Sequence, residues 1–399
     1  MTVQGQSEEE KKASVRWLGD DPLGEPPDAS PEALGALLKA LFPLHRSITG
    51  DGVRQTLRML QSIADFDVVE VPTGTRVFDW CVPEEWRVRE AYIARPDGGR
   101  VVDVRDHNLH LVSYSAPYSG RLNFASLAPH LHAIPERPDA IPYRTTYYKR
   151  DWGFCVPQRT IDRMDRSADY DVVVDTEFVQ GSLTLGEAVV AGRSEREYIV
   201  HTYCCHPSMG NDNLSGVVLW AHLLRMLRAC RPKHTYRFVI APETIGALAY
   251  LMRHGHDLGR VEGAFVLATV GGRGPLCIKS SYLGTAQVDR AARLALLGIG
   301  EAFEEHPFDV FGSDERQYSS PGFRIPCVTI ASGRYHRYPE YHTSDDDLSC
   351  LSLDALGRSL KAYWSAIRVL EGDATVVSSS PCGEPMLSRR GLYPHLGGG

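Results

Sequence analysis

The chain has 399 residues and a formal net charge of −7, and 43% of its residues are hydrophobic while 23% are charged. This length allows a large core and two domains, and the acidic balance argues against a general nucleic-acid-binding protein. No apolar run is long enough to cross a bilayer. The N-terminus lacks the apolar core of a secretory signal, so we expect a cytoplasmic protein that does not contact membranes.

The nine cysteines form no Cys-x-x-Cys pair, which fits reduced thiols in a cytosolic setting. Cys204 and Cys205 are adjacent within a predicted buried strand. We therefore assign both to core packing rather than to chemistry.

A polar tail that contains Pro and Gly is predicted at residues 1–29. The first elements after it are two helices and a strand, over 31–42, 52–63 and 66–71. From 76 to 157, short β-like runs alternate with Pro, Gly and Asp turns, and aromatic residues are dense, which predicts a β-rich inserted domain. These aromatic residues form the core of the insertion, or a few of them near 147–154 face the cleft of the main domain.

Strand and helix patterns then alternate along the chain. Strands are predicted at 170–174, 186–191, 197–205, 236–241, 263–270 and 326–331. Helices are predicted at 214–227, before 252, at 285–297 and at 351–370. This order predicts an α/β fold in which a mostly parallel sheet is sandwiched by helices. We assign the segments as follows: 30–75 and 158–375 to the α/β domain, 76–157 to the inserted domain, and 1–29 and 376–399 to tails.

Residues 197–216 are the centre of this arrangement, because a buried strand there leads through a polar loop into an apolar helix. The loop carries His206 and Asp212. Ligands of open α/β sheets bind beyond the carboxyl ends of the strands, where a His and an Asp could share a divalent metal ion. Alternatively, Asp212 or Asn213 caps the helix that follows.

A carboxylate, Glu243, follows the apolar strand at 236–241. It is a candidate metal ligand, or a general base for water activated by a metal ion. The alternative is an acid in the first turn of a helix, where the helix dipole favours it.

Two later segments place further polar side chains near predicted strand ends. Asp314 and Arg316 could line a polar pocket, or begin a short helix. His342 is a candidate metal ligand, and Asp346 could orient an imidazole. The acidic run around Asp346 also suits the start of the final helix.

Four candidate ligands lie at the C-terminal end of a predicted strand or in the loop after it: His206, Asp212, Glu243 and His342. Nitrogen and carboxylate ligands above a parallel sheet suit zinc, with an open position left for water. Their convergence is a stronger signal than any one of them.

The order of these motifs resembles that of the zinc aminopeptidases with a co-catalytic two-metal site. The motifs are His206, Asp-Asn-Leu-Ser-Gly at 212–216, Glu-Thr-Ile-Gly at 243–246, Ser-Asp at 313–314 with Tyr318, and His-Thr at 342–343 with Asp346. The chain is still more similar to a subfamily of aminopeptidase-like proteins that is often associated with polysaccharide or natural-product biosynthesis. The segments that resemble the signatures of this subfamily are 152–155, 205–209, 242–246, 314–318 and 341–344. The resemblance covers roughly 35–395 and implies a phosphorylase/hydrolase-like α/β fold.

The resemblance also implies a role for each matched residue. His206 corresponds to a ligand of one metal ion, Asp212 to the carboxylate that bridges both ions, and His342 to a ligand of the other ion. Glu243 corresponds to the general base that deprotonates water.

Three departures from the aminopeptidase pattern point to one zinc ion rather than two. Thr244 replaces a second acid that binds metal, and Ser208 replaces an Asp that orients the first His. The stretch 265–270 lacks the acid that provides a further ligand. A single zinc held by His206, Asp212 and His342 is therefore expected, with Glu243 as base or fourth ligand.

We expect a zinc-dependent hydrolase that cleaves an amide or peptide bond in a small or peptide-like substrate. Arg316 or Tyr318 could bind a substrate carboxylate or stabilise the oxyanion. The residues expected to support the ligands or contact the substrate are Asp346, Asp314, Arg316, Tyr318 and Asn213. Two alternatives stay open: a binding protein that has lost catalysis, and an amide-forming or cyclising enzyme on the same scaffold. A homo-oligomer also stays open.

Overall fold

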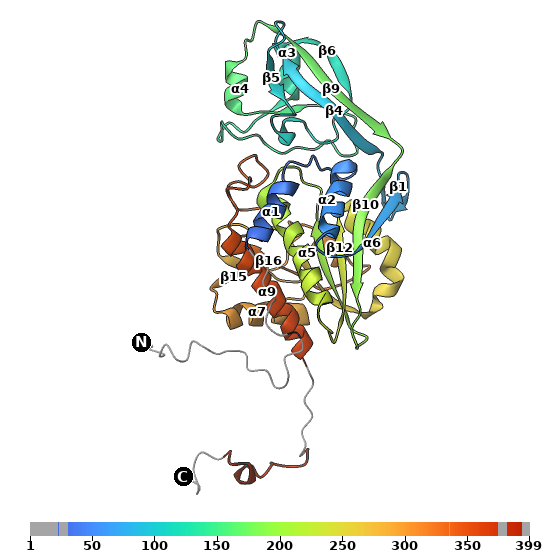
Figure 1. The fold of residues 1–399 in the computed structure, drawn as a ribbon, viewed down its shortest axis with the longest axis vertical. Coiled ribbons are helices and arrows are strands. Elements are labelled where there is room, and N and C mark those ends of the chain that lie inside the picture. Colours follow the sequence, from blue (N-terminus) through green and yellow to red (C-terminus); the bar gives the residue numbers. More distant parts are fainter. Residues whose placement is uncertain (1–22, 24–30, 335, 374–380, 393–399) are drawn as a thin grey trace, which may run out of the picture.

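The computed structural model describes residues 23, 31–334, 336–373 and 381–392. Most of the predicted tails, 1–29 and 376–399, therefore lies outside the described residues. Figure 1 shows a larger α/β unit, with a smaller β-rich unit above it in this view. No helix in the described part of the chain has both the length and the apolar character needed to cross a membrane.

The α/β unit is built on an eight-stranded sheet. In spatial order, its strands are β1 (Asp67–Pro72), β10 (Ser182–Val190), β12 (Thr235–Ala241), β11 (Glu197–Tyr203), β13 (Val261–Leu267), β16 (Cys327–Ser332), β14 (Leu276–Lys279) and β15 (Phe303–His306). The four central strands, β12, β11, β13 and β16, are parallel to one another. β10 and β14 join them antiparallel, so the predicted α/β class with a mostly parallel sheet is confirmed.

Helices cover both faces of this sheet because each central strand is apolar on both sides. In β13, Phe265 packs on one face, and Ala264 and Val266 pack on the other. The helices of the first face are α1 (Pro31–Leu41), α2 (Asp51–Gln61), α5 (Ser215–Arg228), α7 (Gln287–Ile299) and α9 (Leu353–Gly372). The opposite face carries α6 (Ile245–His254) and the short α8 (Glu315–Tyr318).

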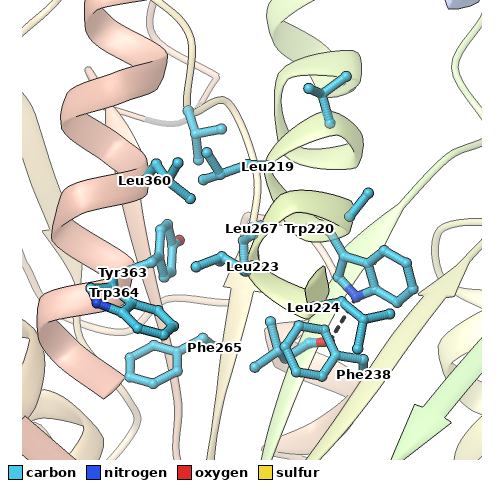
Figure 2. Close-up of a cluster of buried hydrophobic side chains, with 14 of the residues drawn as sticks. Leu219, Trp220, Leu223, Leu224, Phe238, Phe265, Leu267, Leu360, Tyr363 and Trp364 are labelled. Carbon is cyan, nitrogen blue, oxygen red and sulfur yellow. Dashed lines mark hydrogen bonds between the residues drawn. The ribbon is translucent and has the colours of Figure 1, made fainter. Parts of the chain in front are cut away.

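Large aromatic side chains fill the interface between α5, α9 and the sheet (Figure 2). Trp220 of α5 is fully buried, and its indole nitrogen donates to the carbonyl of Val200 in β11. The hydroxyl of Tyr363 in α9 lies within hydrogen-bond distance of the carbonyls of Val266 and Ile330, at 3.0 and 2.9 Å, and accepts from the amide of Ile330. These bonds satisfy the polar ends of buried aromatic side chains and fix the helices to the strands that carry the candidate site.

The smaller unit contains a four-stranded antiparallel sheet. Its strands, in spatial order, are β5 (Arg100–Asp103), β4 (Glu85–Ala94), β9 (Asp169–Val179) and β6 (Tyr118–Asn123). Around this sheet lie β2 (Arg76–Val77), β3 (Trp80–Cys81), α3 (Phe124–Leu127), β7 (Leu131–His132), β8 (Phe154–Cys155) and α4 (Gln158–Arg163).

The predicted end of the insertion at residue 157 lies too early. β9 pairs with β4 and β6 in the smaller sheet and then leads into β10 of the main sheet. The β-rich segment therefore extends to Val179. Strand patterning reports that a segment is extended and half-buried, but not which of two sheets it joins.

Candidate metal centre

The four candidate ligands converge at one edge of the main sheet. His206 and Asp212 lie in the loop after β11, Glu243 follows β12, and His342 lies in the loop after β16. These strands are parallel and lie within four adjacent positions of the sheet. Their carboxyl ends therefore meet at the same edge, where ligands of such sheets bind.

The loop that carries Asp212 is held by Asp346. The Asp346 carboxylate accepts hydrogen bonds from the backbone amides of Asn211 and Asp212, at 2.6 and 2.9 Å, and from the hydroxyl of Tyr338 at 2.8 Å. The sequence predicts that Asp346 orients an imidazole, but its contacts instead fix the backbone of the ligand loop. A Cβ at Gly210 would lie 2.6 Å from the carbonyl oxygen of Asp347, so this close approach requires glycine.

Three donor atoms point toward a common position. Asp212 Oδ2 lies 3.0 Å from His342 Nε2 and 3.9 Å from His206 Nε2. Asp212 Oδ2 and His342 Nε2 are both buried, and their polar contacts among the described residues are with each other and, for Asp212 Oδ2, with His206. Tetrahedral zinc, with ligands at roughly 2.0–2.1 Å, separates its donor atoms by about 3.3 Å. The three residues therefore fit a divalent cation.

The protonation states also suit metal binding. Burial lowers the pKa of His206 to about 4, although Asp212 opposes this shift, so the imidazole is neutral near pH 7. Burial alone would raise the pKa of Asp212, but His206, His342 and Tyr203 outweigh it and hold this pKa at about 2. One carboxylate and neutral imidazole are the forms that coordinate metal ions.

The second oxygen of Asp212 already has a partner. The hydroxyl of Tyr203, the last residue of β11, donates to Asp212 Oδ1 at 2.6 Å. The other oxygen, Oδ2, faces His206 and His342. The sequence does not predict the contact with Tyr203, because Tyr203 is one of several buried aromatic residues in strands and only the fold shows where its hydroxyl points.

A tight turn after β12 directs Glu243 toward the three ligands. The amide of Ile245 donates to the carbonyl of Glu243 at 2.8 Å, and Thr244 at the centre of this turn has φ 66° and ψ −76°. Such a turn is rare and strained for a residue with a Cβ. Asp314 Oδ1 accepts the amide of Thr244 at 2.7 Å, and Asp314 Oδ2 accepts from His201 at 2.8 Å. Asp314 thus links the turn at Thr244 to His201 in β11.

Glu243 reaches both the ligand cluster and the solvent-accessible cavity. Glu243 Oε2 lies 3.8 Å from His206 Nε2, and the side chain is 21% exposed. Burial, and then the charges of Asp314 and Asp212, raise the pKa of Glu243 well above its ordinary value, while Ser313 and Arg316 oppose the shift. A carboxylate with a raised pKa beside a metal site is suited to accept a proton.

Two of the predicted supporting residues are too buried to contact a substrate. Tyr318 is fully buried, with its hydroxyl 3.1 Å from His201 Nδ1, so the predicted substrate contact is wrong. The Asn213 amide donates to the carbonyls of Tyr203 and Leu267 and thereby joins the ends of β11 and β13. Helix α5 has no side-chain N-cap, so neither Asp212 nor Asn213 caps it.

The positions that depart from the aminopeptidase pattern have other contacts. The Ser208 hydroxyl donates to the carbonyl of Phe42 and accepts from Asn108 of the smaller unit. Thr244 Oγ1 lies 3.4 Å from a guanidinium nitrogen of Arg316, which is exposed at the rim of the site. The backbone of Thr269, after β13, donates to Asn213. None of these three positions carries an acid.

The ligand cluster opens into a cavity of about 320 Å³. Its walls come from both units: Ile48, Trp80, Tyr143, Thr145, Tyr147, Tyr148, Cys205, His206, Glu243, Thr244, Ile245 and His342. Aromatic residues of the insertion therefore face the main cleft, which was one of the two expectations for them. Cys205, which we had assigned to core packing, also lines this cavity, and its sulfur lies 3.4 Å from His206 Nδ1.

A buried arginine that no sequence motif indicates lies behind the cluster. Arg46 Nε donates to the carbonyl of His206 at 3.0 Å, and another guanidinium nitrogen donates to the carbonyl of Leu41. The third nitrogen, Nη2, has no hydrogen-bond partner among the described residues. Burial lowers the pKa of Arg46 to about 10, so the side chain stays charged near pH 7.

Comparisons with known proteins agree with this architecture. A family model described as a domain of unknown function (DUF4910) matches residues 35–373. A Clostridium acetobutylicum protein is 40% identical over 363 residues, which cover 91% of this chain and 83% of that protein. It is named, provisionally, a polysaccharide biosynthesis protein with an aminopeptidase-like domain.

Solved structures show the same fold. A crystal structure from Clostridium acetobutylicum, provisionally described as a peptidase, has a TM-score of 0.86 and 39% identity, and the match covers 90% of this chain and 85% of that one. BSAP, a zinc aminopeptidase from Bacillus subtilis, has a TM-score of 0.63 at 14% identity, over 86% of this chain and 95% of that one. At this identity the likeness to BSAP concerns the fold alone.

Proposed function

The chain belongs to the DUF4910 family of aminopeptidase-like proteins, and we propose that it is a zinc-dependent hydrolase of an amide or peptide bond in a small substrate. One observation carries the proposal. The donor atoms of His206, Asp212 and His342 lie within 4.8 Å of one another, beside the carboxylate of Glu243 at the end of a cavity. Three protein ligands with a position left open are typical of catalytic rather than structural zinc.

Each residue of the site has a separate role in the proposed hydrolysis. When bound, zinc supplies Lewis acidity for the amide carbonyl and for water. Glu243 takes the proton of the attacking water and returns a proton to the leaving nitrogen, so that an acid and an amine are formed. Asp212 is the one anionic ligand, which leaves net positive charge at the site for the oxyanion that develops. Asp314 keeps Glu243 in place through the amide of Thr244.

We propose one zinc ion per chain. Asp212 Oδ1 accepts a hydrogen bond from Tyr203, while Oδ2 faces both His206 and His342, which supports one shared cation. No acid is present at 208, 244 or 269 to complete a second site. We assign Glu243 the role of base because its side chain reaches the cavity and its pKa is raised. Its 3.8 Å contact with His206 is as close as that between the ligands Asp212 and His206, so distance does not decide between base and fourth ligand.

The substrate is proposed to be a small molecule from a biosynthetic pathway. A cavity of about 320 Å³ is at the lower end of the range for small-molecule sites. The relative from Clostridium acetobutylicum is named for polysaccharide biosynthesis, which supports a biosynthetic role for this chain.

The proposal is tested with a panel of amino-acid and N-acylamino-acid 4-nitroanilides, with and without the metal. Dialysis against dipicolinate should lower turnover by more than about 100-fold, because the Lewis acid is lost, and stoichiometric zinc should restore it. Mass spectrometry of the products separates hydrolysis, which adds water, from a cyclising reaction, which does not. Zinc-loaded protein that binds members of the panel but never turns them over would instead support the binding-protein alternative.

A further inference from the structure

The wall of the cavity that faces the ligands is aromatic and comes from the smaller unit. The ring of Tyr143 lies 5.1 Å from that of His206 and 5.2 Å from that of His342. Trp80 and Tyr148 lie edge to face, 5.5 Å apart, and also line the cavity. Such rings offer flat, apolar faces on which another ring can stack.

Among the described residues that line this cavity, the carboxylates available to receive an ammonium group are few. Of the described residues that line it, Glu243 alone carries a carboxylate, and the proposed reaction uses Glu243 as the base. Asp212 has one oxygen bonded to Tyr203 and the other at the metal position. Asp314 is fully buried, with its two oxygens bonded to His201 and to the amide of Thr244.

Two arginines lie near this end of the cavity, beside the carboxylates of Asp212, Glu243 and Asp314 that already have other roles. Arg46 bonds to backbone carbonyls, and no carboxylate among the described residues forms an ion pair with it. Arg316 lies at the rim, beside Thr244. A substrate ammonium bound here, beside the proposed metal ion, would lose its hydration and would find no carboxylate left to pair with. Its binding is therefore unfavourable.

We infer that the cavity accepts the acyl or amine part of its substrate as an uncharged group with a flat, apolar ring face, and that it excludes a free ammonium next to the scissile amide. This inference rests on the proposed function and narrows it. The favoured substrates are neutral amides, such as N-acylated amines, and not the free amino termini on which an aminopeptidase acts. An aromatic ring and the apolar face of a sugar offer the same chemistry to this wall.

The test uses two matched pairs of ligands with the zinc-loaded protein. The aromatic pair is 3-phenylpropanamide and phenylalaninamide, and the sugar pair is N-acetylglucosamine and glucosamine; within each pair, one member is neutral and the other carries an ammonium. Dissociation constants come from tryptophan fluorescence, and cleavage is followed by mass spectrometry. In one of the two pairs, the neutral member should bind at least about tenfold more tightly than the ammonium member. The pair that shows this difference tells whether the cavity prefers an aromatic ring or a sugar ring.

Variants locate the binding to the aromatic wall. Trp80→Ala should weaken binding of the preferred neutral ligand by about fivefold or more when measured by calorimetry. Phe311→Ala removes an aromatic side chain that is 71% exposed and lies outside the cavity, and it should leave binding unchanged. Equal losses in both variants would overturn the assignment to this wall.

The outcomes separate this inference from the proposed function. If the ammonium members bind as tightly as the neutral ones, or if no member binds, the inference is overturned, whether or not amides are cleaved. If a neutral member binds preferentially and is never cleaved, the cavity has the inferred selectivity and the hydrolase proposal fails instead.

Discussion

Glu243→Gln is expected to lower kcat by about 1,000-fold while the protein retains its zinc. The amide side chain has nearly the same size and shape as the carboxylate but cannot accept a proton from water, and removing a general base costs typically 10²–10⁴-fold. Metal binding should persist because the three proposed ligands, His206, Asp212 and His342, are unchanged. Turnover and zinc content are measured on the same sample.

A matched variant controls for the loss of a glutamate as such. Glu304→Gln changes a side chain that is 65% exposed and lies in β15, away from the cluster, and it should keep full activity. Full turnover in Glu243→Gln would contradict the role of Glu243 as base. Loss of zinc together with activity would instead identify Glu243 as a ligand.

Trp220→Ala is expected to destabilise the protein by about 3–5 kcal/mol, because it leaves a large cavity between α5 and the sheet. It also removes the hydrogen bond to the carbonyl of Val200 in β11. With roughly 2.1 cal/mol/K of unfolding entropy per residue, a change of this size lowers the Tm by about 5 °C in a chain of this length. Differential scanning calorimetry measures the shift.

The exposed Trp80 provides the comparison. Its side chain is 42% exposed in the short strand β3, so Trp80→Ala should change the Tm by less than about 1 °C. Equal shifts in the two variants would contradict the account of the core in Figure 2.

Long periodic patterns made most of the main fold predictable. The buried run 197–205 and the apolar helix at 214–227 correspond to β11 and α5, and the final helix corresponds to α9. β14 and β15 were missed, because four residues are too few to show a period and Phe-Glu-Glu-His at 303–306 does not look like a buried strand. The partner sheet of β9 was also beyond prediction, since strand pairing is decided by tertiary packing.

The candidate ligands were predictable because each combines a metal-binding side chain with the end of an apolar strand. His206, Asp212 and His342 carry that signal in the sequence itself. The residues that support these ligands carry no such signal in the sequence. Tyr203 acts through one hydroxyl and Arg46 through its guanidinium, and each contacts a residue that only the folded chain brings close. Asp346 was noticed for its charge, but its bonds to backbone amides depend on how two loops approach each other.

The most direct test of the account is the zinc content per chain, measured by elemental mass spectrometry on protein purified without chelators. Asp212→Ala is measured beside the wild type, and Asp257→Ala, at a side chain that is 54% exposed, serves as the control. A mononuclear site should hold one zinc per chain in the wild type and the control, and none in Asp212→Ala. Two zinc ions in the wild type, or none even after zinc is added, would contradict a mononuclear hydrolase.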